Sequence, residues 1–446
     1  MCDTIAVHGS LTGHGKNILM KNSDRPLGEC QPLVYFPGEN GKYAVLGSKP
    51  YWIHGFEMGA NEKGLFIGNE AEGSRCPAET EEGMLGMDML RYALEHAASC
   101  REAIRVLAGL LDGHGQNANA SRLFDRRYEN SYILCDKKEV WVMETAGREW
   151  AAREIHDYAA VSNCYTIETD YDLCSENMEK LVREKRWLHP SEPVSFAKAY
   201  TLPASRQRNA LPRRRRMMKL LTGIFDKEGK VGFSDLQTIF RDHSEDEVNA
   251  PRFGAMTGNN VSVCMHACSW EEAQTAASMY MSYEAETGIL RFLWAPGTPC
   301  TSLYLPVWWI PGEELHLPDI LSAGGEFYSE ESLWWTTERL SSLISTDEER
   351  FGEAVNRKLS LLEKTFLRRE QERLTVVKRL IAEGNSFEAQ QMLNQFTKEC
   401  ADEAAEQMKE LSSEITGKIE AAGGLYGPRK EFLEAYGKRT AMPLPG

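Results

Sequence analysis

The sequence lacks long apolar runs and the common short motifs of nucleotide-binding, zinc-peptidase and serine-hydrolase sites. No stretch approaches the roughly 18 apolar residues of a membrane-spanning helix. The amino terminus has no basic segment followed by an apolar run of about 7 to 15 residues, as a signal peptide would have. Patterns of the P-loop, GxSxG, HExxH and Rossmann types are also absent. We therefore expect a cytoplasmic protein with no membrane partner and no cofactor.

Cysteines in a CxxC spacing are also missing, although the chain of 446 residues contains 11 cysteines. An odd number of cysteines without regular spacing is typical of a reduced, intracellular protein. Basic residues are the minority, because 51 Lys and Arg stand against 66 Asp and Glu and leave a formal net charge of −15. A surface of that sign repels polyanions, so no nucleic-acid partner is expected.

One short Cys/His group, formed by Cys264, His266 and Cys268, could ligate zinc. The residues around it resemble a strand, in which alternation would place all three side chains on one face. A four-coordinate zinc site needs a further ligand, and the sequence contains no second Cys/His cluster that would supply one. No metal is therefore expected.

Short apolar segments bounded by turn residues predict strands, and apolar residues at helical spacing predict helices over 84–98 and 101–111. The expected strands are 3–8, 17–21, 43–47, 64–69, 131–136, 139–144, 148–153, 260–266, 277–283 and 289–294. Strands and helices that arrive in runs, with hairpins among the strands, favour antiparallel sheets layered against helices.

The pattern changes near residue 331, where long polar amphipathic helices begin. Gly384-Asn385-Ser386 separates two of them, so we expect a helical hairpin that packs on the core or on a second subunit. The tail over 423–446 is punctuated by Gly and Pro and is expected to be extended. The chain is longer than single cores usually grow, and we expect a domain of residues 1–330, a helical region of residues 331–446, and a homo-oligomer.

Cys2 directly follows Met1, so removal of Met1 would leave a thiol and a free α-amine on one residue. The amine has an ordinary pKa of about 7.7 to 8.0 and the thiol about 8.5, so the amine can take the thiol proton near neutral pH without a histidine. A strand beginning at the terminus would fix Cys2 in place. Considered alone, a cysteine at position 2 more often belongs to a mobile terminus.

Five short blocks occur in order between residues 2 and 163. They are Cys2-Asp3-Thr4, then Lys21-Asn22-Ser23-Asp24-Arg25-Pro26, then Asn61-Glu62-Lys63-Gly64-Leu65 with Gly68-Asn69-Glu70, then Trp141-Val142-Met143-Glu144-Thr145-Ala146-Gly147, and then Val161-Ser162-Asn163. In this order the blocks resemble the cysteine dipeptidase and secernin family of N-terminal nucleophile hydrolases, whose more distant relatives include penicillin V acylase and bile salt hydrolase. The resemblance implies an α+β fold, the four-layer αββα sandwich, here with a C-terminal helical extension.

The resemblance also implies roles for four side chains. Cys2 would be the nucleophile, and Asp24 would hold its amine or thiol. Asn69 would donate a hydrogen bond to the oxyanion, and Asn163 would hold the nucleophilic residue. On local physics alone, Asp24 and both asparagines would also suit turns or strand ends.

Two basic positions complete the implied site. The family arginine, expected just before a helix, falls within the run from Arg213 to Arg216, and Arg213 is our choice. Lys21 stands where bile salt hydrolases carry an arginine. A lysine can lower the pKa of a nearby thiol as a cation but lacks the fork of donors that arginine has.

The activity that the resemblance implies is hydrolysis of small amides, with a small-molecule or dipeptide substrate. Dipeptides are the first choice, and N-acyl amides with a bulky acyl group, as for penicillin V acylase, are the second. A secernin-like interaction protein without hydrolase activity is the alternative from another class. It is suggested by Lys21 in place of arginine and by the polar helices after residue 331.

Overall fold

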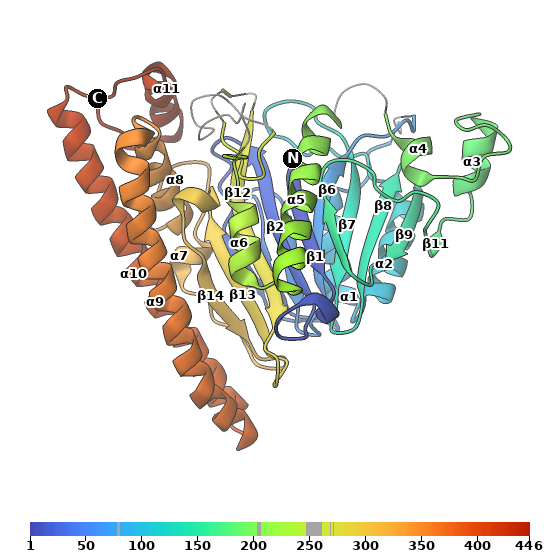
Figure 1. The fold of residues 1–446 in the computed structure, drawn as a ribbon, viewed down its shortest axis with the longest axis horizontal. Coiled ribbons are helices and arrows are strands. Elements are labelled where there is room, and N and C mark those ends of the chain that lie inside the picture. Colours follow the sequence, from blue (N-terminus) through green and yellow to red (C-terminus); the bar gives the residue numbers. More distant parts are fainter. Residues whose placement is uncertain (78–80, 203–206, 247–260, 268, 271) are drawn as a thin grey trace. The chain divides into compact units, whose positions relative to one another are not determined.

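The computed structural model describes residues 1–446 except 78–80, 203–206, 247–260, 268 and 271 (Figure 1). The chain forms two compact units, each assembled from separate stretches. Unit 1 comprises Met1–Lys21, Phe36–Gly47 and Ile53–Asp235, and unit 2 comprises Asn22–Tyr35, Ser48–Trp52 and Leu236–Gly446. The domain boundary expected at residue 330 stays a prediction.

The fold is α+β, with two antiparallel sheets and helices. The elements of unit 1 are β1 (Cys2–Val7), η1 (Gly9–Leu11), β5 (Met58–Asn61), β6 (Phe66–Glu72), α1 (Gly86–His96), α2 (Cys100–His114), β7 (Glu129–Cys135), β8 (Val140–Ala146), β9 (Glu149–Glu154), β10 (Tyr158–Val161), β11 (Leu173–Cys174), α3 (Met178–Glu184), α4 (Phe196–Tyr200) and α5 (Gln207–Glu228). The elements whose residues the two units share are β2 (Ile18–Pro26), β3 (Leu33–Phe36), β4 (Val45–Ser48) and α6 (Phe233–Phe240).

Unit 1 contains the layers that the resemblance implies. Strands β5, β6, β7, β8, β9 and β11 pair as antiparallel neighbours in that order. Strand β1 packs on β6 and β7 of this sheet, and helices α1 and α2 pack on the same sheet. Helix α5 packs on β1 and on β10, the strand paired with β1. Figure 1 shows α5 beside β1 and α2 beyond strands β7 to β9. The order is therefore helix, sheet, sheet, helix, and the prediction of an αββα sandwich is confirmed.

Local sequence signals account for the start of α2 and for the face that it turns toward the sheet. Ser99 caps α2 by accepting a hydrogen bond from the backbone of Glu102, whose carboxylate in turn accepts one from Ala98 N. A serine followed three residues later by glutamate is a common helix-start signal. The apolar stripe of α2, with Ile104 and Leu107 buried, faces the sheet, as the helical periodicity predicts.

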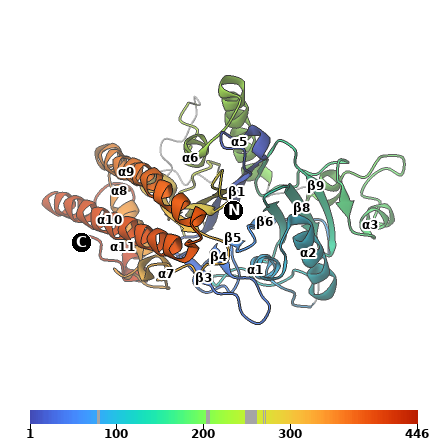
Figure 2. The ribbon, with the colours of Figure 1, turned by 90° about the horizontal axis from the view of Figure 1, so that it is seen from below.

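Unit 2 contains a second set of strands and the long helices. Its elements are β12 (Ala273–Tyr283), β13 (Leu290–Pro296), η3 (Pro299–Thr301), β14 (Leu305–Trp309), α7 (Asp319–Ser322), α8 (Leu333–Ile344), α9 (Glu348–Ala382), α10 (Ser386–Ala421) and α11 (Lys430–Thr440). Strands β12, β13 and β14 are antiparallel neighbours. Helices α9 and α10 lie side by side in both views (Figure 1, Figure 2) and pack on β14. The expected helical hairpin is confirmed.

Two expectations for unit 2 are wrong. The tail over 423–446 is not extended throughout, because α11 forms there, with Leu433 and Tyr436 buried and Tyr436 in a small apolar cluster. Residue 260 lies outside the described residues, and 261–266 form turns and a single bridge instead of a strand. Side chains hold this segment, since Ser262 Oγ donates to Cys264 O and Asn22 Nδ2 donates to Val263 O.

Among the helices that the described residues form, none combines the length and the apolar character that crossing a bilayer requires.

Candidate active site

The register of β1 against β10 brings Asn163 opposite Cys2. Thr4 pairs with Val161 and Ile5 with Ala160, so the next antiparallel steps place Ser162 and Asn163 beside the start of β1. Asn163 Oδ1 accepts a hydrogen bond of 2.9 Å from Cys2 N. Cys2 is buried, with 4% of its surface exposed. The strand thus holds the nucleophile candidate in one position, as expected from the sequence.

Arg213 binds the same two residues from α5. Its Nη1 donates to Cys2 O at 3.1 Å and to Asp3 Oδ2 at 2.5 Å, and its Nη2 donates to Asn163 Oδ1 at 2.8 Å. The guanidinium and the Asp3 carboxylate are both fully buried. The fork of donors that distinguishes arginine from lysine is used here. Arg213 lies inside α5 and not before a helix, so that part of the sequence-based expectation is wrong.

Lys21 provides a buried cation next to the Cys2 thiol. Its Nζ donates to Glu57 O at 2.8 Å and pairs with Glu57 Oε2 at 3.2 Å, and Glu57 Oε2 lies 3.8 Å from Cys2 Sγ. Burial disfavours the charge on Lys21, but the adjacent Cys2, Glu57 and Glu70 outweigh this effect and raise the pKa of Lys21 above its ordinary value. A cation that stays charged at this position favours the thiolate form of a neighbouring cysteine.

Glu57 and Glu70 are site residues that the sequence reasoning missed. Glu70 is fully buried, and the hydroxyl of Thr4 donates to its carboxyl. Burial raises the pKa of Glu70 to about 8, although Lys21 and the Thr4 hydroxyl oppose the shift. This carboxyl therefore takes up a proton more readily than an ordinary glutamate does. Glu70 stood inside one of the family blocks, whereas no local signal marked Glu57.

Asn69 points to the other face of its strand. Because side chains alternate along β6, Gly68 and Glu70 face β1, and a Cβ on Gly68 would lie 3.2 Å from Lys21 Cδ. Asn69 Nδ2 instead donates to Asn130 Oδ1 at 3.0 Å, and its Oδ1 accepts from Lys21 Nζ at 3.1 Å. Asn69 thus reaches Cys2 through Lys21, and its role as an oxyanion donor stays a prediction.

Asp24 belongs to unit 2, where it is buried and its Oδ1 accepts a hydrogen bond of 2.7 Å from Thr275 Oγ1. The predicted function of Asp24, to hold the Cys2 amine or thiol, stays a prediction. Of the five predicted site residues, the structure joins Cys2, Asn163 and Arg213 by direct hydrogen bonds.

The Cys/His group considered in the sequence has a different environment from the expected one. Cys268 lies outside the described residues, but Cys264 and His266 have two further neighbours, His243 and Cys300. The expectation that no further Cys/His residues would complete a group of four is therefore wrong. Sequence spacing gave no signal, because these two residues come from separate segments of the chain.

Comparison with known proteins gives a family match and distant structural likenesses. The model of peptidase family C69 matches residues 42–359, a span that contains Asn69, Asn163 and Arg213 and begins after Cys2 and Asp24. A mutant of conjugated bile acid hydrolase from Clostridium perfringens is 14% identical, with 66% of this chain and 88% of that chain covered and a TM-score of 0.38. An N-acylethanolamine-hydrolyzing acid amidase ortholog from Caenorhabditis elegans is 13% identical, with 63% and 92% covered and a TM-score of 0.34.

Proposed function

Because the chain belongs to peptidase family C69, and is therefore a hydrolase of amide bonds, we propose that it cleaves small amides, in the first place dipeptides, with Cys2 as an N-terminal nucleophile. The observation that carries this proposal is the fixed and buried position of Cys2, bonded through its nitrogen to Asn163 and through its carbonyl to Arg213. A mobile terminal cysteine would have none of these bonds.

The chemistry begins once Met1 has been removed and the Cys2 amine is free. The thiol gives its proton to that amine, and the sulfur forms a bond to the substrate carbonyl carbon. The tetrahedral intermediate collapses as the C–N bond breaks, and the leaving nitrogen takes the proton from the ammonium. Water then attacks the thioester, passing a proton to the amine, and the C–S bond breaks to release the carboxylic acid and restore the thiol.

The neighbouring side chains would orient these steps. Asn163 Oδ1 accepts from the Cys2 nitrogen and would aim the lone pair of the free amine toward the thiol. The Lys21 cation would favour the thiolate at the moment of attack. Asp24 would supply a further carboxylate for the amine or thiol.

The oxyanion needs donors that are in place before the reaction. We assign a backbone N–H and the Asn69 side-chain amide as the donors to the oxyanion. The amide nitrogen of Asn69 carries two hydrogens, and the bond to Asn130 uses one of them. Through its carbonyl oxygen Asn69 also orients the Lys21 ammonium, so it would act as a positioning residue for that cation.

A substrate panel tests the proposed specificity. Unblocked dipeptides, the same dipeptides with an N-acetyl group, N-acyl amino acids and penicillin V would be compared by kcat/KM. The unblocked dipeptides should be preferred by about tenfold or more, which is the discrimination that one hydrogen bond to a charged group provides. Cleavage of the acylated compounds alone would reject the dipeptidase assignment, and cleavage of none would favour the interaction protein.

A further inference from the structure

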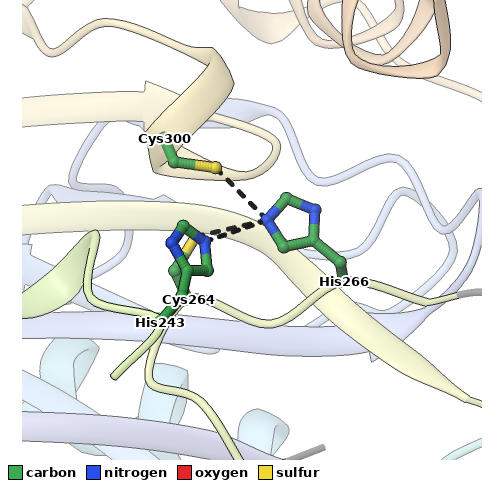
Figure 3. Close-up of side chains that lie close together, drawn as sticks. All are labelled: His243, Cys264, His266 and Cys300. Carbon is green, nitrogen blue, oxygen red and sulfur yellow. Dashed lines mark hydrogen bonds between the residues drawn. The ribbon is translucent and has the colours of Figure 1, made fainter. Parts of the chain in front are cut away.

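Four side chains with metal-ligand atoms converge in unit 2, outside the Cys2 site. They are His243, which follows α6, Cys264 and His266 from the segment before β12, and Cys300 in η3 (Figure 3). Their ligand atoms all lie within 4.8 Å of one another. His243, Cys264 and His266 are buried, and Cys300 is partly buried.

The separations match those around a tetrahedral zinc ion. Zinc binds sulfur at about 2.3 Å and nitrogen at about 2.0 to 2.1 Å, so tetrahedral angles place two nitrogens about 3.3 Å apart and a nitrogen and a sulfur about 3.6 Å apart. The Nε2 atoms of His243 and His266 are 3.2 Å apart. His266 Nε2 lies 3.8 Å from Cys264 Sγ and 3.2 Å from Cys300 Sγ.

Hydrogen bonding alone does not satisfy this arrangement. His266 Nε2 faces three partners at once, as Figure 3 shows, namely the ring of His243 and both sulfurs. A ring nitrogen has a single in-plane position, which holds either one proton or one lone pair. It can therefore make at most one good hydrogen bond among the three. An ion between the four atoms would contact all of them through their lone pairs.

We propose that His243, Cys264, His266 and Cys300 form a zinc site of the two-cysteine, two-histidine type. Two thiolates and two imidazoles are a set that zinc prefers over calcium or magnesium, whose ligands are oxygens. Four protein ligands leave no position for water or substrate, so the ion has a structural function. The four ligands share no residue with the proposed chemistry at Cys2, and the proposal does not depend on it.

The residues around the four ligands support their orientation. His243 Nδ1 bonds to Glu245 Oε1 at 2.9 Å, which fixes the ring and leaves Nε2 as the ligand atom. A carboxylate behind a metal-bound histidine is a frequent feature of zinc sites. Arg241 donates to Pro299 O at 2.8 Å and to Ser302 O at 3.2 Å, so the turn that carries Cys300 is attached to the segment that carries His243.

The same segments are joined to β2 and β12. Asn22 Nδ2 donates to Phe240 O and to Val263 O, each at 3.0 Å, just before His243 and Cys264. Met265, between two ligands, donates its N–H to Thr275 Oγ1 at 3.0 Å, and that hydroxyl donates to Asp24. Zinc would thus hold together the three segments that carry the ligands, one of which is linked to Asp24 through Thr275.

The first test is the metal content of the full-length wild-type protein, purified without chelator and with reducing agent. Elemental analysis should find about one zinc per chain. Removal of the metal by a strong chelator should lower the thermal unfolding temperature, and zinc chloride should restore it. Cobalt added to the metal-free protein should produce the absorption bands of tetrahedral thiolate coordination. Absence of zinc together with no response to added zinc or cobalt would overturn the proposal, as would a Cys264–Cys300 disulfide in the freshly purified protein.

The zinc content of substituted proteins distinguishes the ligand residues from residues that only pack near them. Cys264→Ser and Cys300→Ser should each lose bound zinc, whereas Cys30→Ser, which removes a buried thiol of the same unit, should keep one zinc per chain. Glu245→Ala should fold and should bind zinc about 10- to 100-fold more weakly, the effect of losing such a supporting carboxylate. Glu331→Ala, at an exposed position, is its control. Unchanged zinc affinity in both cysteine variants would contradict the assignment.

Discussion

Replacement of Cys2 by alanine should abolish amide hydrolysis while the protein remains folded. Loss of the nucleophile removes the group that forms the thioester, and such losses reduce kcat by roughly 10⁴-fold or more. The fold should tolerate the change, because the bonds to Asn163 and Arg213 come from the main chain of Cys2, which alanine keeps. The thiol itself lies 3.8 Å from Glu57 Oε2. The measurements are the rate of dipeptide hydrolysis and the thermal unfolding temperature.

Cys135→Ala is the matched control for this experiment. Cys135 is a fully buried cysteine of the same unit, on β7, and it belongs to neither the Cys2 group nor the Cys/His cluster. Its replacement removes a thiol of equal size and should leave the rate of hydrolysis near the wild-type value. Wild-type activity in a folded Cys2→Ala protein would disprove the assignment of the nucleophile.

Replacement of Arg213 by methionine should reduce both stability and activity. Breaking a buried ion pair by removing one partner typically costs about 3 to 5 kcal/mol of the free energy of unfolding, because the other charge stays buried without a partner. The remaining charge here is Asp3, which is fully buried. Activity should also fall, since Cys2 O and Asn163 Oδ1 lose their guanidinium donors. Chemical denaturation and dipeptide hydrolysis measure the two effects.

Asp3→Asn in the Arg213→Met background separates these two effects. The double variant no longer contains the unpaired carboxylate, so part of the lost stability should return while activity stays low. In the single variant the deficit should shrink in mildly acidic buffer, because burial raises the pKa of Asp3 and protonation removes its charge as the pH falls. Wild-type stability and activity in Arg213→Met would contradict a supporting role for the guanidinium.

The sequence predicts those features that depend on local periodicity. The short apolar segments bounded by turn residues form β6 to β9, and β6, β7 and β8 bury nearly all of their residues. The helical spacing persists in α1, α2, α9 and α10, because each of these helices buries an apolar stripe. Helix α11 was missed, since its stability comes from the contact of Tyr436 with other segments rather than from its own Gly-punctuated composition.

The site was predictable only where residues lie in recognisable blocks. Cys2 and Asn163 stand in two such blocks, and β1 and β10 bring them together. Glu57 forms an ion pair with Lys21, but the segment around Glu57 contains no sequence motif that would have predicted it. His243 and Cys300 are separated from Cys264 by long stretches of chain, and tertiary packing, which no spacing rule describes, brings them together.

The most direct test of the central proposal, an N-terminal cysteine nucleophile, is intact-protein mass spectrometry beside the dipeptide assay. With Met1 present the nitrogen of Cys2 is an amide, which neither accepts nor carries a proton, so the thiol loses its base. Preparations made with and without excess methionine aminopeptidase would differ in the fraction of trimmed protein. Activity should rise in proportion to the fraction whose mass is lower by one methionine residue. Full activity in protein that quantitatively retains Met1 would contradict the mechanism.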